Sequence, residues 1–153
     1  MRSTKISSNI EDYLKTIYRI ELERGVVRVK EISEVMQVTY PSTSGILGKM
    51  EAMGLVEHEK YGYVRLSDSG RKIARKMFDR EIGITLFLHN ILKVKKEQAR
   101  LEACRLEHGL TDETAKKLLT FIEFIATPSK VRDDFMAAFE KQLKEVELEA
   151  SEA

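Results

Sequence analysis

The sequence predicts a mainly α-helical protein in which an N-terminal winged helix-turn-helix with a two-stranded wing precedes an all-helical domain. Three observations predict this class. Apolar residues recur at three- and four-residue spacings along most of the chain, a helix opened by Pro41 follows a short helix, and strand-like alternation surrounds Tyr61-Gly62. We place the domains at residues 1–70 and 71–153.

Three helices are expected before the wing. The first runs from Ser8 to Arg24 and ends at Gly25, a typical helix stop. A second, short helix covers Val29–Met36. Pro41 opens the third, because a proline at the first helical position gives up no hydrogen bond, and that helix ends at Gly54. One face of the first helix is apolar through Ile10, Leu14, Ile17 and Tyr18.

The wing and the second domain follow. Residues 55–60 and 63–66 alternate as two strands of a hairpin. Ser67-Asp68 is a suitable cap for a long connecting helix over about 69–92. Three more helices are expected at Lys95–His108, Asp112–Ala126 and Ser129–Leu148.

The composition excludes several classes of protein. Of 153 residues, 42% are hydrophobic and 33% charged, which suits a buried core and not a disordered chain. No apolar run approaches the roughly 18 to 20 residues of a membrane span, and the N-terminus lacks the apolar stretch of a signal peptide. A single cysteine, Cys104, excludes an intramolecular disulfide and fits a reducing compartment. We therefore expect a cytoplasmic protein without a membrane partner.

The charge is distributed unevenly along the chain. Its formal net value is only +1, whereas nucleic-acid-binding domains usually carry a basic excess. Residues 1–80 hold 15 Lys+Arg and 11 Asp+Glu, a net of +4, and residues 81–153 hold 11 and 14, a net of −3. The N-terminal half therefore remains a candidate for binding nucleic acid.

The third helix is the candidate DNA-recognition helix. In a helix-turn-helix, the second helix of the pair presents its N-terminal side chains to the major groove. Short polar groups begin this helix, Lys49 lies further along it, and the wing tip adds two residues that would reach an adjacent backbone. A Ser/Thr run after proline is also typical of an ordinary helix start. The candidate DNA-binding residues are Thr39, Pro41, Ser42, Thr43, Ser44, Lys49, Lys60 and Tyr61.

A candidate metal-binding group lies in the second domain. Glu107 and His108 follow Cys104 by three and four residues, so the three side chains share one face of a helix. Sulfur, carboxylate and imidazole together suit a first-row transition metal better than calcium or magnesium. The alternative is that Cys104 is a small buried hydrophobe and that Glu107-His108 is a solvated helix end.

Four stretches together resemble a known family. They are Asp12-Tyr13-Leu14 with Ile17-Tyr18, the helix that contains Pro41, Met53-Gly54-Leu55-Val56, and Glu102-Ala103-Cys104-Arg105-Leu106-Glu107-His108. The chain resembles the diphtheria toxin repressor and manganese transport regulator family from about Asn9 to Ala126. The resemblance implies a cytoplasmic, homodimeric, metal-activated transcription factor, in the short form without an SH3-like domain.

The resemblance also implies a ligand set. The family's metal-binding positions fall on Asp12, Glu81, Cys104, Glu107 and His108. Glu81 replaces the usual histidine, Cys104 matches the iron-responsive branch, and Asp12 matches the manganese branch. Other family ligand positions are Lys15, whose ammonium cannot ligate a metal, and Thr85 and Arg100, which argues against a second site. The expected cofactor is a divalent transition metal, Mn²⁺ or Fe²⁺ ahead of Zn²⁺ or Co²⁺.

These observations favour a metal-dependent repressor that binds a double-stranded DNA operator as a homodimer. Its metal would bridge the DNA-binding and dimerisation domains, and the apolar residues 118–125 would supply the dimer interface. A winged-helix regulator that senses a small organic ligand is an alternative. A small metalloenzyme is a weaker one, because the sequence shows no acid–base constellation, phosphate loop or HExxH motif. No catalytic residue and no organic cofactor are expected.

Overall fold

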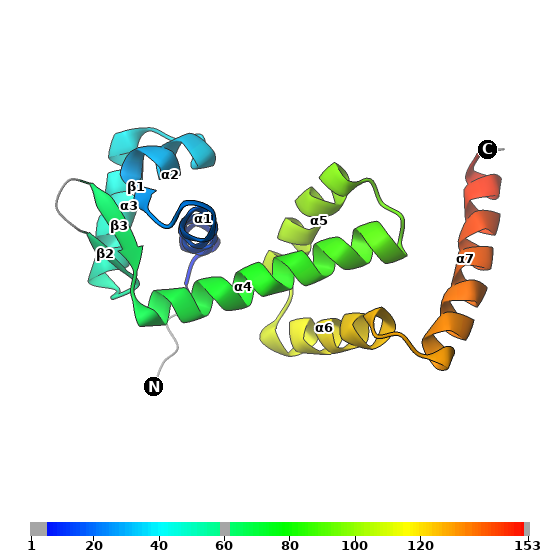
Figure 1. The fold of residues 1–153 in the computed structure, drawn as a ribbon. Helices are drawn as coiled ribbons and strands as arrows, with labels where there is room; N and C mark the ends of the chain where they lie inside the picture. Colours follow the sequence, from blue (N-terminus) through cyan, green and yellow to red (C-terminus); the bar gives the residue numbers. More distant parts are fainter. Residues whose placement is uncertain (1–5, 59–61, 152–153) are drawn as a thin grey trace.

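The computed structural model describes residues 6–58 and 62–151, and the predicted elements occur in the predicted order, with a strand, β1, and a π-helix, η1, in addition (Figure 1). The mainly helical fold with a winged N-terminal domain is confirmed. The elements are α1 (Ser8–Arg24), β1 (Val27–Arg28), α2 (Val29–Met36), α3 (Tyr40–Ala52), β2 (Val56–His58), β3 (Tyr63–Leu66), α4 (Asp68–Leu86), the π-helix η1 (Phe87–Ile91), α5 (Lys96–Gly109), α6 (Asp112–Ala126) and α7 (Lys130–Ser151).

Local signals fix the helix ends in the N-terminal domain. The hydroxyl of Ser7 accepts a hydrogen bond from the backbone N–H of Ile10 at the start of α1. Gly25 ends α1 with a φ of 75°, a conformation that costs glycine little. At α3 the hydroxyl of Thr39 accepts from the N–H of Ser42, while Pro41 lies in the first turn. These caps explain why the predicted boundaries were accurate.

The wing contains one more strand than the sequence predicts. The sheet has the order β1-β3-β2, and β1 pairs antiparallel with β3 so that Val27 lies opposite Val64. A strand of two residues shows no alternation, so its sequence carries no signal of it. Strands β1 and β3 of this sheet pack against α1.

The N-terminal domain has its own apolar core. Burying one large apolar side chain contributes about 1.5–3 kcal/mol, and this core contains many of them. Those with no measurable exposure are Leu14, Ile17, Ile32, Leu47 and Met50.

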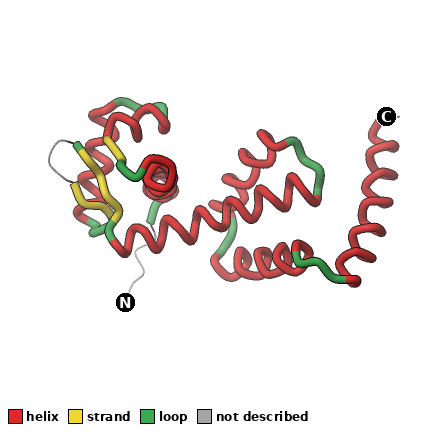
Figure 2. The backbone as a smooth tube through the Cα atoms, in the orientation of Figure 1, coloured by secondary structure: helices red, strands yellow, loops and turns green. Residues whose placement is uncertain are grey.

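The α4 helix connects the two halves of the molecule. It leaves the wing, passes α1, and continues between α5 and α6 (Figure 1). The long helix predicted to about residue 92 changes at Phe87 into η1, a wider helical turn. A second apolar core forms where these helices meet, made of Ile84, Leu88, Ala99, Ala103 and Ile122. Beyond α6, the first half of α7 lies near η1 and α6, where Phe135 and Phe139 line a cavity with Phe87 and Phe121, and the end of α7 lies far from the N-terminal domain (Figure 2).

Within the part of the chain that the structure describes, no helix combines the length and apolarity needed to cross a membrane.

Substituting Gly70 tests the junction between the wing and α4. A Cβ at Gly70 would overlap the backbone carbonyl oxygen of Leu55, which cannot move without displacing the strand that follows. We expect Gly70→Ala to lower the free energy of unfolding by about 1–3 kcal/mol, as measured by urea denaturation. Gly48→Ala is the matched control, because a Cβ there meets nothing within 4 Å. The packing argument is wrong if the two variants are equally stable.

The pairing of Arg80 with Asp112 predicts a pH dependence. Arg80 is 8% exposed and donates to Asp112 at 2.7 Å. Hydrogen bonds from Arg80 and then Lys76 lower the pKa of Asp112. A lowered carboxyl pKa stabilises the fold above the ordinary value of about 3.9, and this contribution is lost as pH falls through the lower folded-state pKa.

We therefore expect Asp112→Asn to destabilise the protein at pH 7 by about 1 kcal/mol, a modest effect because water screens the exposed carboxylate. Urea denaturation at several pH values should show the difference from the parent protein narrowing toward pH 3. Glu113→Gln, which removes the carboxylate of an exposed ion pair with Lys117, is the control. A difference that stays constant with pH would contradict the assignment.

Candidate metal centre

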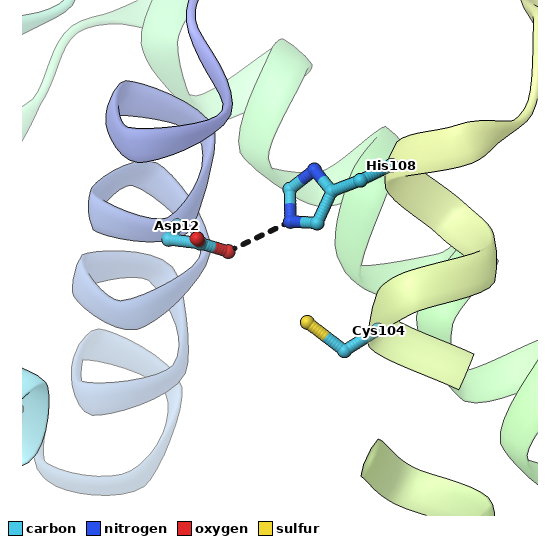
Figure 3. A group of neighbouring side chains, drawn as sticks. All are labelled: Asp12, Cys104 and His108. Atoms are coloured by element: carbon cyan, nitrogen blue, oxygen red, sulfur yellow. Dashed lines mark hydrogen bonds and ion pairs between the residues drawn. The ribbon is translucent and has the colours of Figure 1, made fainter. Parts of the chain in front are cut away.

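Donor groups from α1 and α5 converge at the contact between the two domains. Asp12 from α1 and Cys104 and His108 from α5 each offer one ligand atom, and these atoms lie within 4.8 Å of one another (Figure 3). The carboxylate of Asp12 is 3.0 Å from Nε2 of His108. Cys104 and His108 point in the same direction because they are four residues apart on a helix. The structure thus brings together three of the predicted ligands.

Glu11, which is not among the ligands predicted from the sequence, also contacts this cluster. Its Oε2 lies 3.1 Å from Nδ1 of His108, so both ring nitrogens of the imidazole face carboxylates from α1. The one available signal was the position of Glu11 directly before Asp12 in the sequence. A sequence pattern does not show which of two neighbouring acids turns toward a second domain.

Of the other two predicted ligands, Glu81 reaches the cluster through Lys15, whereas Glu107 contacts both Lys15 and His108, with its Oε2 3.7 Å from Nδ1 of His108. The Lys15 ammonium lies 2.8 Å from Oε2 of Glu81, 3.5 Å from Oε2 of Glu107, 3.3 Å from Oδ1 of Asp12 and 3.9 Å from Sγ of Cys104. Its side chain is only 8% exposed. Four of the five predicted ligand residues therefore surround one buried lysine, and the fifth, His108, contacts Asp12 and Glu107.

The surroundings raise the pKa of Lys15, Cys104 and Glu107, which favours the charged form of the lysine and the neutral forms of the thiol and the carboxyl. Burial alone would lower the pKa of Lys15, but the hydrogen bond and charge of Glu81 outweigh it and raise that pKa. Burial raises the pKa of the Cys104 thiol and of the Glu107 carboxyl, although the positive charge of Lys15 opposes both shifts. An additional cation would favour the ionised thiol and carboxyl, since metal ligands bind in their deprotonated forms.

The donor set fits a divalent transition metal on the side of Asp12, Cys104 and His108. Thiolate, imidazole and carboxylate are ligands for first-row ions such as Mn²⁺, Fe²⁺, Co²⁺ and Zn²⁺. At the other candidate positions, the Thr85 hydroxyl donates to the backbone oxygen of Glu81, and Arg100 is exposed. These two positions give no support to a second metal site.

The candidate DNA-binding residues lie at the start of α3 and along it. Thr39, Pro41, Ser42 and Lys49 are exposed, and Ser44 is half-buried. Thr43 is fully buried, and its hydroxyl donates to the backbone oxygen of Thr39. It stabilises the first turn of α3 from inside, so we leave it out of the contact surface. Lys60 and Tyr61 lie outside the described residues.

A winged domain joined to a helical domain that holds this donor cluster defines a metal-dependent DNA-binding regulator. The chain belongs to the iron dependent repressor family. The family's N-terminal DNA binding domain matches residues 5–64, and its metal binding and dimerisation domain matches residues 67–135. Because this family consists of DNA-binding regulators, the metalloenzyme and organic-ligand alternatives are set aside.

Relatives support the same assignment. The chain is 31% identical to the HTH-type transcriptional regulator MJ0568 of Methanocaldococcus jannaschii, over 77% of this chain and 95% of that protein. It is 29% identical to the diphtheria toxin repressor of Corynebacterium glutamicum, over 74% of this chain and 50% of that protein. A manganese-dependent transcriptional repressor solved with manganese is 31% identical, with a TM-score of 0.67, over 75% and 53% of the two chains. The chain spans about half the length of the latter two proteins.

Proposed function

We propose that this chain is a metal-responsive transcriptional repressor that binds operator DNA as a homodimer in the cytoplasm. The proposal rests on one observation: the ligand atoms of Asp12, Cys104 and His108 lie close together. Asp12 belongs to the domain that contains α3, whereas the other two belong to the helical domain. Binding of a metal ion at this cluster would therefore change how the two domains are positioned relative to each other.

Asp12, Cys104 and His108 would hold the ion, with Glu107 and Glu81 beside them. When bound, the ion supplies positive charge that draws carboxylate and thiolate groups of both domains together. We propose Mn²⁺ or Fe²⁺ as the natural ion, with Zn²⁺ and Co²⁺ as further candidates. Cys104 offers the softer ligand typical of iron and zinc sites, and the manganese-bound structure named above supports manganese.

The DNA-contacting surface is the exposed side of α3 together with the wing. Ser42 and Ser44 are short enough for a close approach to phosphates or base edges, and Lys49 adds a positive charge. Two such helices in a symmetric dimer would contact half-sites about 34–36 Å apart or a multiple of this distance. The net charge of +4 in residues 1–80 supports this assignment.

The dimer would form through α6. Phe121 and Phe124 are 44% and 54% exposed, which is unusual for two large aromatic residues one turn apart. They belong to the apolar stretch 118–125. A second copy of the chain would remove them from water.

Removing two ligands tests the metal response. In the parent protein we expect Mn²⁺, Fe²⁺ or Co²⁺ to raise operator affinity about 5- to 150-fold, the usual range of coupling between two sites. The double variant Cys104→Ala/His108→Ala should lose this increase. Anaerobic fluorescence anisotropy with labelled DNA, in chelator and in metal, measures both proteins.

His89→Gln is the matched control, because this imidazole lies on η1 and interacts with the backbone oxygen of Val94, outside the cluster. The proposal fails if the parent protein binds specific DNA equally well in chelator and in every metal tried.

Lys49 gives a separate test of the DNA surface. Lys49→Gln should weaken binding similarly on specific and non-specific DNA, because a phosphate contact is independent of sequence. The slope of log affinity against log salt concentration should fall by about 1. Lys117→Gln removes an exposed lysine from α6, in the other domain, and should leave the slope unchanged. An unchanged slope for Lys49→Gln would remove Lys49 from the interface.

A further inference from the structure

Lys15 is an unusual lysine because it is buried among acidic groups. Lysine is among the residues that are almost never fully buried unless they are paired. Here the side chain is 8% exposed, and its ammonium contacts Asp12, Glu81 and Glu107 within 3.5 Å. A lysine in an ordinary surface ion pair, such as Lys117 with Glu113, is 75% exposed.

The contacts of Lys15 span the boundary between the two domains. Lys15 lies on α1, Glu81 on α4 and Glu107 on α5. The same three helices carry the candidate metal ligands. Lys15 therefore supplies a positive charge at the position where acidic groups of both domains meet. Because Lys15 belongs to α1, this charge is always present at that position.

We propose that Lys15 is a tethered cation that holds α1 against α4 and α5 without metal and that opposes the binding of a divalent ion to the neighbouring ligands. The inference rests on the proposed function only where it concerns DNA. Its statements about stability and ion binding concern the isolated chain.

Charge explains both halves of the proposal. Without the ammonium, Glu81 and Glu107 of the helical domain would lie near Asp12 of α1 with no cation between them, and leaving a buried charge unpaired is strongly destabilising. With the ammonium present, an ion that approaches Asp12 and Cys104 meets a positive charge 3.3 Å and 3.9 Å from those same ligand atoms. Like charges at such distances repel, the more so where water is largely excluded.

The proposal predicts a particular combination of effects. Neutralising Lys15 should loosen the metal-free protein and strengthen its binding of metal. If Lys15 served only to fill space, replacing it would change stability equally with and without metal and would leave ion affinity unchanged. The two effects together therefore distinguish a tethered cation from a packing role.

The experiment uses Lys15→Gln, the charge-preserving Lys15→Arg, and Lys117→Gln as a surface control. Thermal unfolding in chelator measures the metal-free state. Anaerobic titration with Co²⁺, followed by the near-ultraviolet absorption of a cobalt–thiolate bond to Cys104, measures ion affinity without DNA. We expect Lys15→Gln to lower the melting temperature in chelator by several degrees and to bind Co²⁺ at least tenfold more tightly. Lys15→Arg should lie closer to the parent protein, and Lys117→Gln should match it.

DNA binding extends the test. Lys15→Gln should bind operator DNA at least fivefold more weakly than the parent in chelator and equally well at saturating metal. If the parent binds no metal but Lys15→Gln does, the tethered cation is supported while the metal response proposed above fails. If Lys15→Gln folds only when Co²⁺ is added, the proposal is also supported. Unchanged or weaker Co²⁺ affinity in Lys15→Gln, or failure of both Lys15 variants to fold with Co²⁺ present, overturns it.

Discussion

The ion-pair cluster of Lys15 with Asp12, Glu81 and Glu107 is the interaction on which the coupling of the two domains depends. Apolar and polar contacts also join α1 to α4, including the edge-on packing of Tyr18 against Phe78 at 5.5 Å and the 2.7 Å ion pair of Arg71 with Glu21. Those contacts hold α1 near the start of α4. The Lys15 cluster instead joins α1 to α4 and α5 together, and with the contacts of His108 to Glu11 and Asp12 it connects the recognition domain with the helix that carries Cys104 and His108.

This arrangement also explains the uneven charge of the chain. The N-terminal half carries the basic excess that suits DNA, and the C-terminal half carries the acidic excess that suits a cation. The domains meet where one basic residue of the first half enters the acidic part of the second. The sheet and the caps of α3 fix the recognition helix within its domain, so a small rotation at the cluster moves that helix as a rigid part of the domain.

Much of the fold could be predicted from the sequence, because helical periodicity, a stop such as Gly25 and a cap such as Ser67 are local signals. The strand β1 and the π-helical turn after Leu86 could not, since one is two residues long and the other continues the helical pattern. In the site, the spacing of Cys104, Glu107 and His108 predicts that they share one face of a helix, and the family resemblance implies Asp12 and Glu81. The contacts of Lys15 and Glu11 depend on how α1 packs against α5, which no local pattern encodes.

A tethered cation sets an upper limit on the range of the metal response. An ion from solution must lose translational freedom on binding, whereas the Lys15 ammonium is already attached to α1 and draws the domains together at every metal concentration. If a fraction f of the metal-free protein already has the DNA-binding arrangement, metal can raise DNA affinity by no more than a factor of 1/f. A larger f therefore means a smaller response. Lys15 raises f and weakens ion binding at the same time, so this chain would respond over a narrower range, and at higher metal concentration, than a chain with a neutral side chain at position 15.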